Sequence, residues 1–281
     1  MDPIAFQLGP VTLHWYGVMM AVAFFAGLWT ASRRAPRTGI SPDAVQDIIL
    51  WLVVGTFVGA RALHVITYWR EGFAGKPFWE IFMIQKGGLV FYGGLIGASI
   101  ACVLYTRRKK IPLWKMADVL APSIPLGYVF GRIGCLLFGC CFGRVCDLPW
   151  AIRFPQGSLA WEQHFRQHLV GEKDPSLPVH PTQVYESLLG LALYLGLAWL
   201  YRRKKFEGQV FAAYLVGYAV TRSIVEIFRG DYTDPHLHGG LTPAHLISIG
   251  IFAAGIGLLW FLRRPRPGAV KVEEKGPKVE G

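Results

Sequence analysis

Apolar residues gather in seven long blocks along the chain, and short polar or basic runs separate them. Each block is close to the roughly 20 residues that a helix needs to cross a bilayer. Uninterrupted apolar runs of this length are typical of membrane-spanning helices. The predicted spans have approximate bounds of 12–32, 46–68, 88–106, 116–138, 182–201, 208–228 and 242–262. The pattern predicts an all-α, polytopic membrane protein of about seven transmembrane helices.

Basic clusters follow the first, third, fifth and seventh spans. These clusters are Arg33, Arg34 and Arg37, then 107–110, 202–205 and 263–267. With seven spans the four clusters fall on one side, which the positive-inside rule identifies as cytoplasmic. The N-terminus is then extracytoplasmic and the C-terminus cytoplasmic. We expect one seven-span domain over 1–262, with a small extracytoplasmic subdomain over 139–181, and a disordered tail over 263–281.

Composition supports the membrane interpretation and excludes a nucleic-acid partner. The chain is 53% hydrophobic and only 17% charged, whereas soluble domains are usually about a quarter charged. The net charge of +11 could indicate nucleic-acid binding. No basic domain or recognition motif accompanies that charge, however. The basic residues are therefore interpreted as topology signals.

Three arginines, Arg61, Arg132 and Arg222, lie inside predicted spans, where a charged side chain costs several kcal/mol and usually marks function. Each precedes the external end of its span by six or seven residues, so each lies about 10 Å deep at 1.5 Å per residue. Polar residues of the same outer layer are Tyr16, Tyr92, His180, Gln183, Tyr185 and Arg229. Three arginines in one layer favour an anionic ligand, and the abundant anion there is a lipid phosphate, which arginine binds with a planar fork of donors.

The sixth span carries its polar residues on one helical face. Tyr218, Arg222, Glu226 and Arg229 are spaced four, four and three residues apart, which aligns them on a helix. An ion pair between Arg222 and Glu226 that only joins helices is the alternative explanation. The pattern alone leaves open whether a bound lipid would be a substrate, a cargo or a structural ligand.

Glycines and cysteines add two further expectations. The pairs Gly55/Gly59, Gly93/Gly97, Gly127/Gly131 and Gly139/Gly143 predict close helix packing. Small apolar packing is the favoured role of Cys135, Cys140 and Cys141, with a disulfide from Cys140 or Cys141 to Cys146 as an alternative at an oxidising face. No Cys-x-x-Cys and His spacing is present, so the sequence predicts no metal site and no cofactor.

Six motifs together resemble the bacterial prolipoprotein diacylglyceryl transferases, over about residues 7–260. They are "GPVTLHWYG", "GARALHVITY", "GGLVFYGGLIGA", "GRIGCLLFGCCFGR", "HPTQVYES" and "TRSIVEIFRGD". The resemblance implies an enzyme of the bacterial inner membrane without a cofactor. Such an enzyme transfers the diacylglyceryl group of phosphatidylglycerol to the thiol of the lipobox cysteine in a preprolipoprotein, and it releases glycerol phosphate. Its partners would be phosphatidylglycerol, lipobox peptides and membrane lipids.

The resemblance also implies residue roles. Arg132 and Arg222 match the two arginines that are thought to bind the lipid phosphate. Functional tyrosines of the family match Tyr16 and Tyr218, and Gly143 closes the signature motif. The block of Arg222 also contains Glu226, expected in the lipid site. Supporting roles are expected for Arg61, Cys135, His180, Gln183, Tyr185 and Arg229.

Two positions depart from the family pattern. Tyr92 stands where well-studied members have a histidine proposed as the general base, and Cys135 stands where asparagine is typical. With a pKa near 10, tyrosine is a poor base at neutral pH. Either Tyr92 acts as a phenolate beside the arginines, or another group such as His180 takes the proton, or this member is impaired. A non-catalytic relative and a lipid transporter are the alternative functions.

Overall fold

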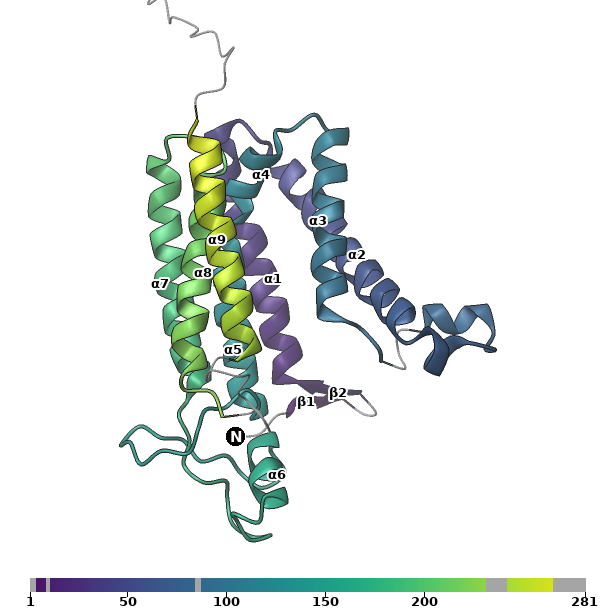
Figure 1. The fold of residues 1–281 in the computed structure, drawn as a ribbon, viewed down its shortest axis with the longest axis vertical. Coiled ribbons are helices and arrows are strands. Elements are labelled where there is room, and N and C mark those ends of the chain that lie inside the picture. The colour runs from purple at the N-terminus through teal and green to yellow at the C-terminus, as the bar shows by residue number, and fades with distance from the viewer. Residues whose placement is uncertain (1–3, 9–10, 84–86, 231–241, 265–281) are drawn as a thin grey trace, which may run out of the picture.

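Long helices standing side by side make up the computed structural model, which describes residues 4–8, 11–83, 87–230 and 242–264 (Figure 1). The long helices are α1 (Trp15–Arg34), α2 (Pro42–Thr67), α3 (Phe91–Arg108), α5 (Ser123–Phe138), α7 (Thr182–Arg203), α8 (Gln209–Glu226) and α9 (Pro243–Arg263). Shorter helices are α4 (Leu113–Leu120) and α6 (Leu159–Arg166), with single turns at Ala35–Thr38, Trp69–Phe73 and Phe78–Phe82.

The predicted spans correspond to these helices. Among the described residues, five segments are long and apolar enough to cross a membrane: Trp15–Thr38, Pro42–Thr67, Leu113–Phe138, Thr182–Arg203 and Pro243–Arg263. The fourth span is interrupted between α4 and α5, where Pro122 has no N–H to continue the helix. The two remaining spans are α3 and α8, each 18 residues long. With α3 packed on α2, and α8 on α7 and α9, the fold is that of a multi-pass membrane protein.

A short β-hairpin precedes α1, which the sequence pattern did not predict. Its strands β1 (Ile4–Leu8) and β2 (Val11–His14) pair in antiparallel register, and the first helix begins at Trp15 rather than at residue 12. The stretch Val11–His14 alternates apolar and polar side chains, which is the period of a strand. The adjoining apolar run concealed that alternation.

Helices α2 and α3 pack closely through the predicted glycine pairs. A methyl group built on Gly55 would lie 2.7 Å from the carbonyl oxygen of Gly97 and 2.7 Å from Cβ of Ala101. Gly59 and Gly93 face each other with equally little space. Because these helix backbones touch, the prediction of close packing is confirmed for these two pairs. It is wrong for Gly127/Gly131, since a methyl group on Gly131 would meet nothing within 4 Å.

The helix ends that carry the basic clusters, those of α1, α3, α7 and α9, lie together at the top of Figure 1. Here the buried carboxylate of Asp118 in α4 accepts hydrogen bonds from the backbone N–H groups of Gly208, Val210 and Phe211, each at 2.9 or 3.0 Å. Lys204 contacts the same carboxylate at 2.8 Å. Asp118 thus caps the start of α8 from a neighbouring helix, because the first N–H groups of a helix have no partner within it.

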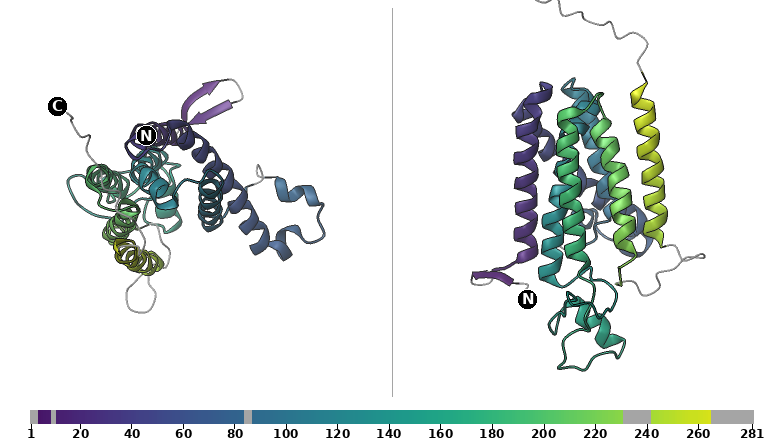
Figure 2. Two further views of the ribbon diagram at one scale, coloured as in Figure 1. Left: turned by 90° about the horizontal axis from the view of Figure 1, so that it is seen from above. Right: turned by 90° about the vertical axis from the view of Figure 1, so that its left-hand side faces the viewer.

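The segment 139–181 forms a small unit at the opposite end, beyond α5 and α7 (Figures 1 and 2). Its core consists of Phe142, Phe154, Ala160 and Val179. Backbone pairing of Val179 with Val145 and with Ile152 holds the loops around that core. The predicted tail falls almost wholly outside the described residues, since α9 ends at Arg263 and nothing is described after residue 264.

Candidate active site

Glu186 lies at the centre of a cluster of arginines between α5, α7 and α8. Its side chain is 3% exposed. One carboxylate oxygen of Glu186 lies 2.7 Å from Nε of Arg132. The other lies 3.5 Å from Nη1 of Arg222 and 3.8 Å from Nη1 of Arg229. One carboxylate of α7 therefore holds together arginines from α5, from α8 and from the residues after α8.

A second buried carboxylate, Glu226, contacts Arg222 alone of the three arginines. The distance from Nη2 of Arg222 to Oε2 of Glu226 is 2.7 Å. The hydroxyl of Thr242, the residue before α9, donates to Oε1 of Glu226 at 2.8 Å. The ion pair that the sequence analysis gives as the alternative explanation is therefore present, and it also ties α8 to the start of α9. These five groups carry three positive and two negative charges, which allows them to share a low-dielectric site.

The same tyrosine–arginine spacing occurs on α5 and on α8. Tyr128 precedes Arg132 by four residues, as Tyr218 precedes Arg222. The hydroxyl of Tyr128 donates to Glu186 at 2.9 Å, and the guanidinium carbon of Arg132 lies 4.6 Å from the centre of the Tyr128 ring. Residues four apart share one helix face. Both helices thus present an arginine and a tyrosine toward α7.

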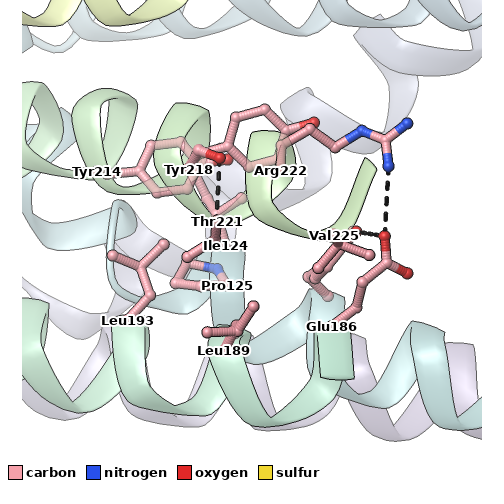
Figure 3. Close-up of a pocket in the computed structure, with 12 residues that line it drawn as sticks. Ile124, Pro125, Glu186, Leu189, Leu193, Tyr214, Tyr218, Thr221, Arg222 and Val225 are labelled. Carbon is pink, nitrogen blue, oxygen red and sulfur yellow. Dashed lines mark hydrogen bonds and ion pairs between the residues drawn. The ribbon is translucent and has the colours of Figure 1, made fainter. Parts of the chain in front are cut away.

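An apolar cavity continues from the charged cluster between α5, α7 and α8 (Figure 3). Glu186 and Arg222 lie at one end, and Leu189, Leu193 and Tyr214 line the rest. Its volume is about 50 Å³, well below the roughly 150 Å³ of an apolar cavity that holds one benzene molecule. The cavity therefore takes only a fragment of an amphiphile, whose remaining length would lie against the helices or in the bilayer.

The signature loop is tied into this site by its backbone. The N–H of Gly143 donates to the carbonyl of His180 at 3.0 Å, and Gly143 pairs with Arg229 in a single β-bridge. A methyl group on Gly143 would lie 2.7 Å from the carbonyl oxygen of Phe228. Only glycine fits between the segments that carry His180 and Arg229. The loop thereby fixes the position of Arg229.

The predicted polar residues of "HPTQVYES" support the loop. Gln183 is buried, and its amide donates to the carbonyl of Cys140 at 2.6 Å. The hydroxyl of Tyr185 lies 3.3 Å from Nδ1 of His180 and accepts a hydrogen bond from Trp150 at 2.8 Å. The His180 ring packs against the rings of Tyr185 and Phe228.

All five cysteines are free thiols, so the alternative of a disulfide to Cys146 is wrong. The sulfur atoms of Cys135, Cys140 and Cys141 instead lie within 4.8 Å of one another. Hydrogen bonds from the Cys135 and Cys140 thiols lower the pKa of the Cys141 thiol below its ordinary value, and the nearby guanidinium groups lower that pKa further. The cysteines therefore lie beside the arginine cluster.

Arg61 does not belong to the cluster, and this part of the sequence interpretation was wrong. Its guanidinium donates to the carbonyls of Glu80 at 2.8 Å, Ile81 at 2.6 Å and Gly87 at 2.8 Å. Equal depth along a span did not place it near Arg132, because α2 packs against α3 and α1 rather than against α7 or α8. Backbone carbonyls of the loop 69–88 satisfy its donors instead.

Two predicted tyrosines lie on other helices. Tyr16, in the first turn of α1, contacts Gly134 and lies near Phe138, with 6.5 Å between the ring centres. Tyr92 begins α3, is 54% exposed, and has its described ring contact with Phe91. The structure thus brings Tyr16 toward the signature motif, whereas it places Tyr92 on the helix pair α2–α3.

Sequence reasoning missed Glu186 and Tyr128. Glu186 lies in the motif "HPTQVYES" of the fifth span, whereas the spacing on the sixth span indicated only Glu226 as a carboxylate partner of the arginines. Its signal was an acidic side chain in the first turns of an apolar span, which is as costly as a buried arginine. Tyr128 could have been found from the repeated Tyr-x-x-x-Arg spacing.

Comparison with known proteins assigns the chain to a family. The model of the prolipoprotein diacylglyceryl transferase family matches residues 3–261. Curated proteins named phosphatidylglycerol–prolipoprotein diacylglyceryl transferase are similar over nearly the whole length. The protein of Proteus mirabilis is 37% identical over 95% of this chain and 94% of its own. That of Synechococcus elongatus is 36% identical over 96% and 91%. This chain belongs to the prolipoprotein diacylglyceryl transferase family.

Proposed function

We propose that this protein transfers the diacylglyceryl group of phosphatidylglycerol to the thiol of a lipobox cysteine in a preprolipoprotein. The observation that carries this function is the orientation of Arg132. Its Nε is held at 2.7 Å by Glu186. The ion pair with Glu186 engages Nε, which leaves the two Nη groups for other acceptors, and the side chain is 15% exposed. They are donors available to a phosphate, with the geometry that arginine offers to phosphate oxygens.

The neighbouring groups suit the rest of the lipid. Arg222 lies across Glu186 from Arg132 and lines the apolar cavity together with Tyr218. A headgroup phosphate at the two arginines would direct the glycerol carbons toward that cavity. An amphiphile with one charged end and two long tails fits a site with a charged cluster, an apolar wall and lipid around it.

The reaction forms one C–S bond and breaks one C–O bond. The thiolate sulfur of the peptide attacks the glycerol carbon that carries the phosphate ester, and the electron pair of the C–O bond leaves with the phosphate. The phosphate changes from a diester with one negative charge to a monoester with about −1.5 to −2. Arginines held in place gain attraction as that charge develops, which lowers the barrier more than it strengthens substrate binding.

The remaining residues have proposed supporting roles. Tyr16 and Tyr218 bind the lipid, and Gly143 lets the signature loop reach Arg229. Tyr92 accepts the thiol proton as a phenolate, or as a neutral phenol it donates a hydrogen bond to the lipid. Its exposure at the start of α3 leaves it accessible to a peptide arriving from the membrane surface.

The proposed location is the bacterial inner membrane. The basic ends of the helices would face the cytoplasm by the positive-inside rule. The unit 139–181 and the hairpin before α1 lie at the other end (Figure 1), so they and the N-terminus would be extracytoplasmic. The arginine cluster, at the ends of the helices next to the unit 139–181, would then meet lipids of the outer leaflet.

The test is transfer by the purified full chain in detergent with phosphatidylglycerol and a lipobox peptide. We expect a peptide mass increased by one diacylglyceryl group and release of glycerol phosphate in equal amount. Arg132→Ala abolishes both products. Arg166→Ala, which removes an exposed arginine of α6, retains them. Unmodified peptide with the wild-type chain, or full transfer by Arg132→Ala, would contradict the proposal.

A further inference from the structure

Three cysteines of the signature motif come together after α5 although they are not adjacent along the helix. Cys135 is in the last turn of α5, and Gly139 ends the helix in a left-handed conformation with φ of 77°. The chain then turns back, because the N–H groups of Gly139 and Cys140 both donate to the carbonyl of Cys135, at 3.0 and 3.1 Å. This helix ending brings residues five and six positions later beside Cys135.

The position of the turn is fixed from α7. The hydroxyl of Thr182 donates to the carbonyl of Cys141 at 2.7 Å, and the amide of Gln183 donates to the carbonyl of Cys140 at 2.6 Å. Both side chains from α7 are fully buried. Cys141 itself has a left-handed φ of 60°, which a residue with a side chain rarely adopts. The packing holds this strained backbone in place, and such strain is usual at functional sites.

We propose that Cys135, Cys140 and Cys141 form a trithiolate site for a thiophilic d¹⁰ metal ion such as Zn²⁺ or Cd²⁺. The three sulfur atoms lie within 4.8 Å of one another. A Zn–S distance of about 2.3 Å places the sulfur atoms of a three-ligand site about 4 Å apart. The thiols need to move by only a fraction of this separation. Binding is a ligand exchange without redox change, in which three thiol protons pass to solvent and an open position stays for water.

The charges around the thiols suit such a site. Three thiolates and a divalent ion carry a net charge of −1. The guanidinium groups of Arg132 and Arg229 interact electrostatically with Cys141, so positive charge is available to stabilise that complex in a partly buried position. Elsewhere in residues 4–8, 11–83, 87–230 and 242–264 no comparable group of three ligands occurs.

The spacing Cys-x₄-Cys-Cys differs from the Cys-x-x-Cys pattern by which sulfur sites are usually recognised. For this reason the sequence predicts no metal site. The three sulfur atoms come together only because α5 ends at Gly139 and the chain turns back. The proposal does not depend on the proposed transfer reaction, since it concerns binding of the metal alone.

The experiment titrates the reduced, detergent-solubilised full chain with Cd²⁺ and follows thiolate-to-metal charge-transfer absorption. We expect one Cd²⁺ per chain, competed by Zn²⁺. The matched control is the double variant Cys102→Ser, Cys146→Ser, which removes the two cysteines outside the cluster and binds as the wild type does. Replacing Cys135, Cys140 or Cys141 singly with serine weakens Cd²⁺ binding at least tenfold. Loss of a group that only orients a metal ligand already costs about tenfold or more in affinity, and loss of a ligand costs at least as much.

A second measurement separates loss of the site from misfolding. Zn²⁺ raises the unfolding temperature of the wild type, because binding to the folded state alone stabilises it. The triple serine variant unfolds at the metal-free temperature of the wild type and gains nothing from Zn²⁺. Absence of charge-transfer absorption in the wild type, or equal Cd²⁺ affinity in the triple variant, would overturn the proposal.

Discussion

Replacing Glu186 with glutamine removes one negative charge and changes the shape of the side chain very little. The carboxylate lies 2.7 Å from Arg132, 3.5 Å from Arg222 and 3.8 Å from Arg229. Removing one partner of a buried ion pair typically costs about 3–5 kcal/mol, because the other charge stays buried without compensation. We expect Glu186→Gln to lower the free energy of unfolding by about 3 kcal/mol, near the lower end of this range. Arg222 keeps its ion pair with Glu226, and Arg132 keeps its contact with the Tyr128 ring.

The effect on transfer follows from the positions of the guanidinium groups. Without the carboxylate, repulsion between arginines moves them apart, and a displacement of about 1 Å at a reacting group costs about 100-fold in rate. That loss corresponds to about 2.7 kcal/mol, from 1.36 kcal/mol per factor of ten. The decrease should appear mainly in kcat, because the phosphate gains charge on the way to the transition state.

The assay measures peptide modification at several phosphatidylglycerol concentrations, together with thermal unfolding in the same detergent. The matched control is Glu162→Gln, which breaks the exposed pair with Arg166 on α6 and changes neither quantity measurably, as exposed pairs contribute little. Unchanged kcat in a folded Glu186→Gln protein would refute the idea that this carboxylate positions the arginines.

Three further predictions concern the surrounding structure. Gly143→Ala pushes His180 and the residues after α8 apart, so we expect it to lower the transfer rate at least tenfold and the free energy of unfolding by about 1–3 kcal/mol. The control Gly131→Ala, with open space at its Cβ, changes both quantities little. Asp118→Ala leaves three N–H groups and a lysine without their acceptor and lowers the unfolding free energy by about 3–5 kcal/mol. Burial lowers the pKa of His164 in the folded protein, so below about pH 6.5 the unfolded chain binds more protons and the folded state loses stability. We expect His164→Gln to reduce the difference between the unfolding free energies measured at pH 7.5 and at pH 5.

The spans could be predicted from the sequence because the bilayer leaves few alternatives. Every backbone group in lipid must be satisfied within the protein, so an apolar block of 20 residues has one solution, a helix. The interruption of the fourth span at Pro122 and the hairpin before α1 were missed for a shared reason. Both are local deviations that short-range backbone geometry decides within an otherwise continuous apolar pattern.

The members of the site were predicted in part. Arg132, Arg222 and Glu226 follow from the cost of burying charge, and the structure places them together. Arg61 has the same sequence signal and lies elsewhere, because depth along a helix says nothing about which helix is the neighbour. Glycines of α2 contact glycines of α3, and this contact holds the two helices together. Only the three-dimensional packing shows that Arg61 is thereby kept away from α7 and α8.

Glu186 explains how three arginines can share a site that must also bind an anion. A carboxylate that orients an arginine also repels an incoming phosphate, by the same Coulomb law. This repulsion grows as the phosphate gains charge, but so does the attraction of the three arginines, which outweigh one carboxylate at the position where the leaving oxygen gains that charge. We therefore expect the carboxylate to weaken the binding of phosphatidylglycerol and to lower the barrier to transfer, and both effects increase turnover. A Glu186→Gln protein that bound phosphatidylglycerol more tightly while transferring it more slowly would show both effects in one variant.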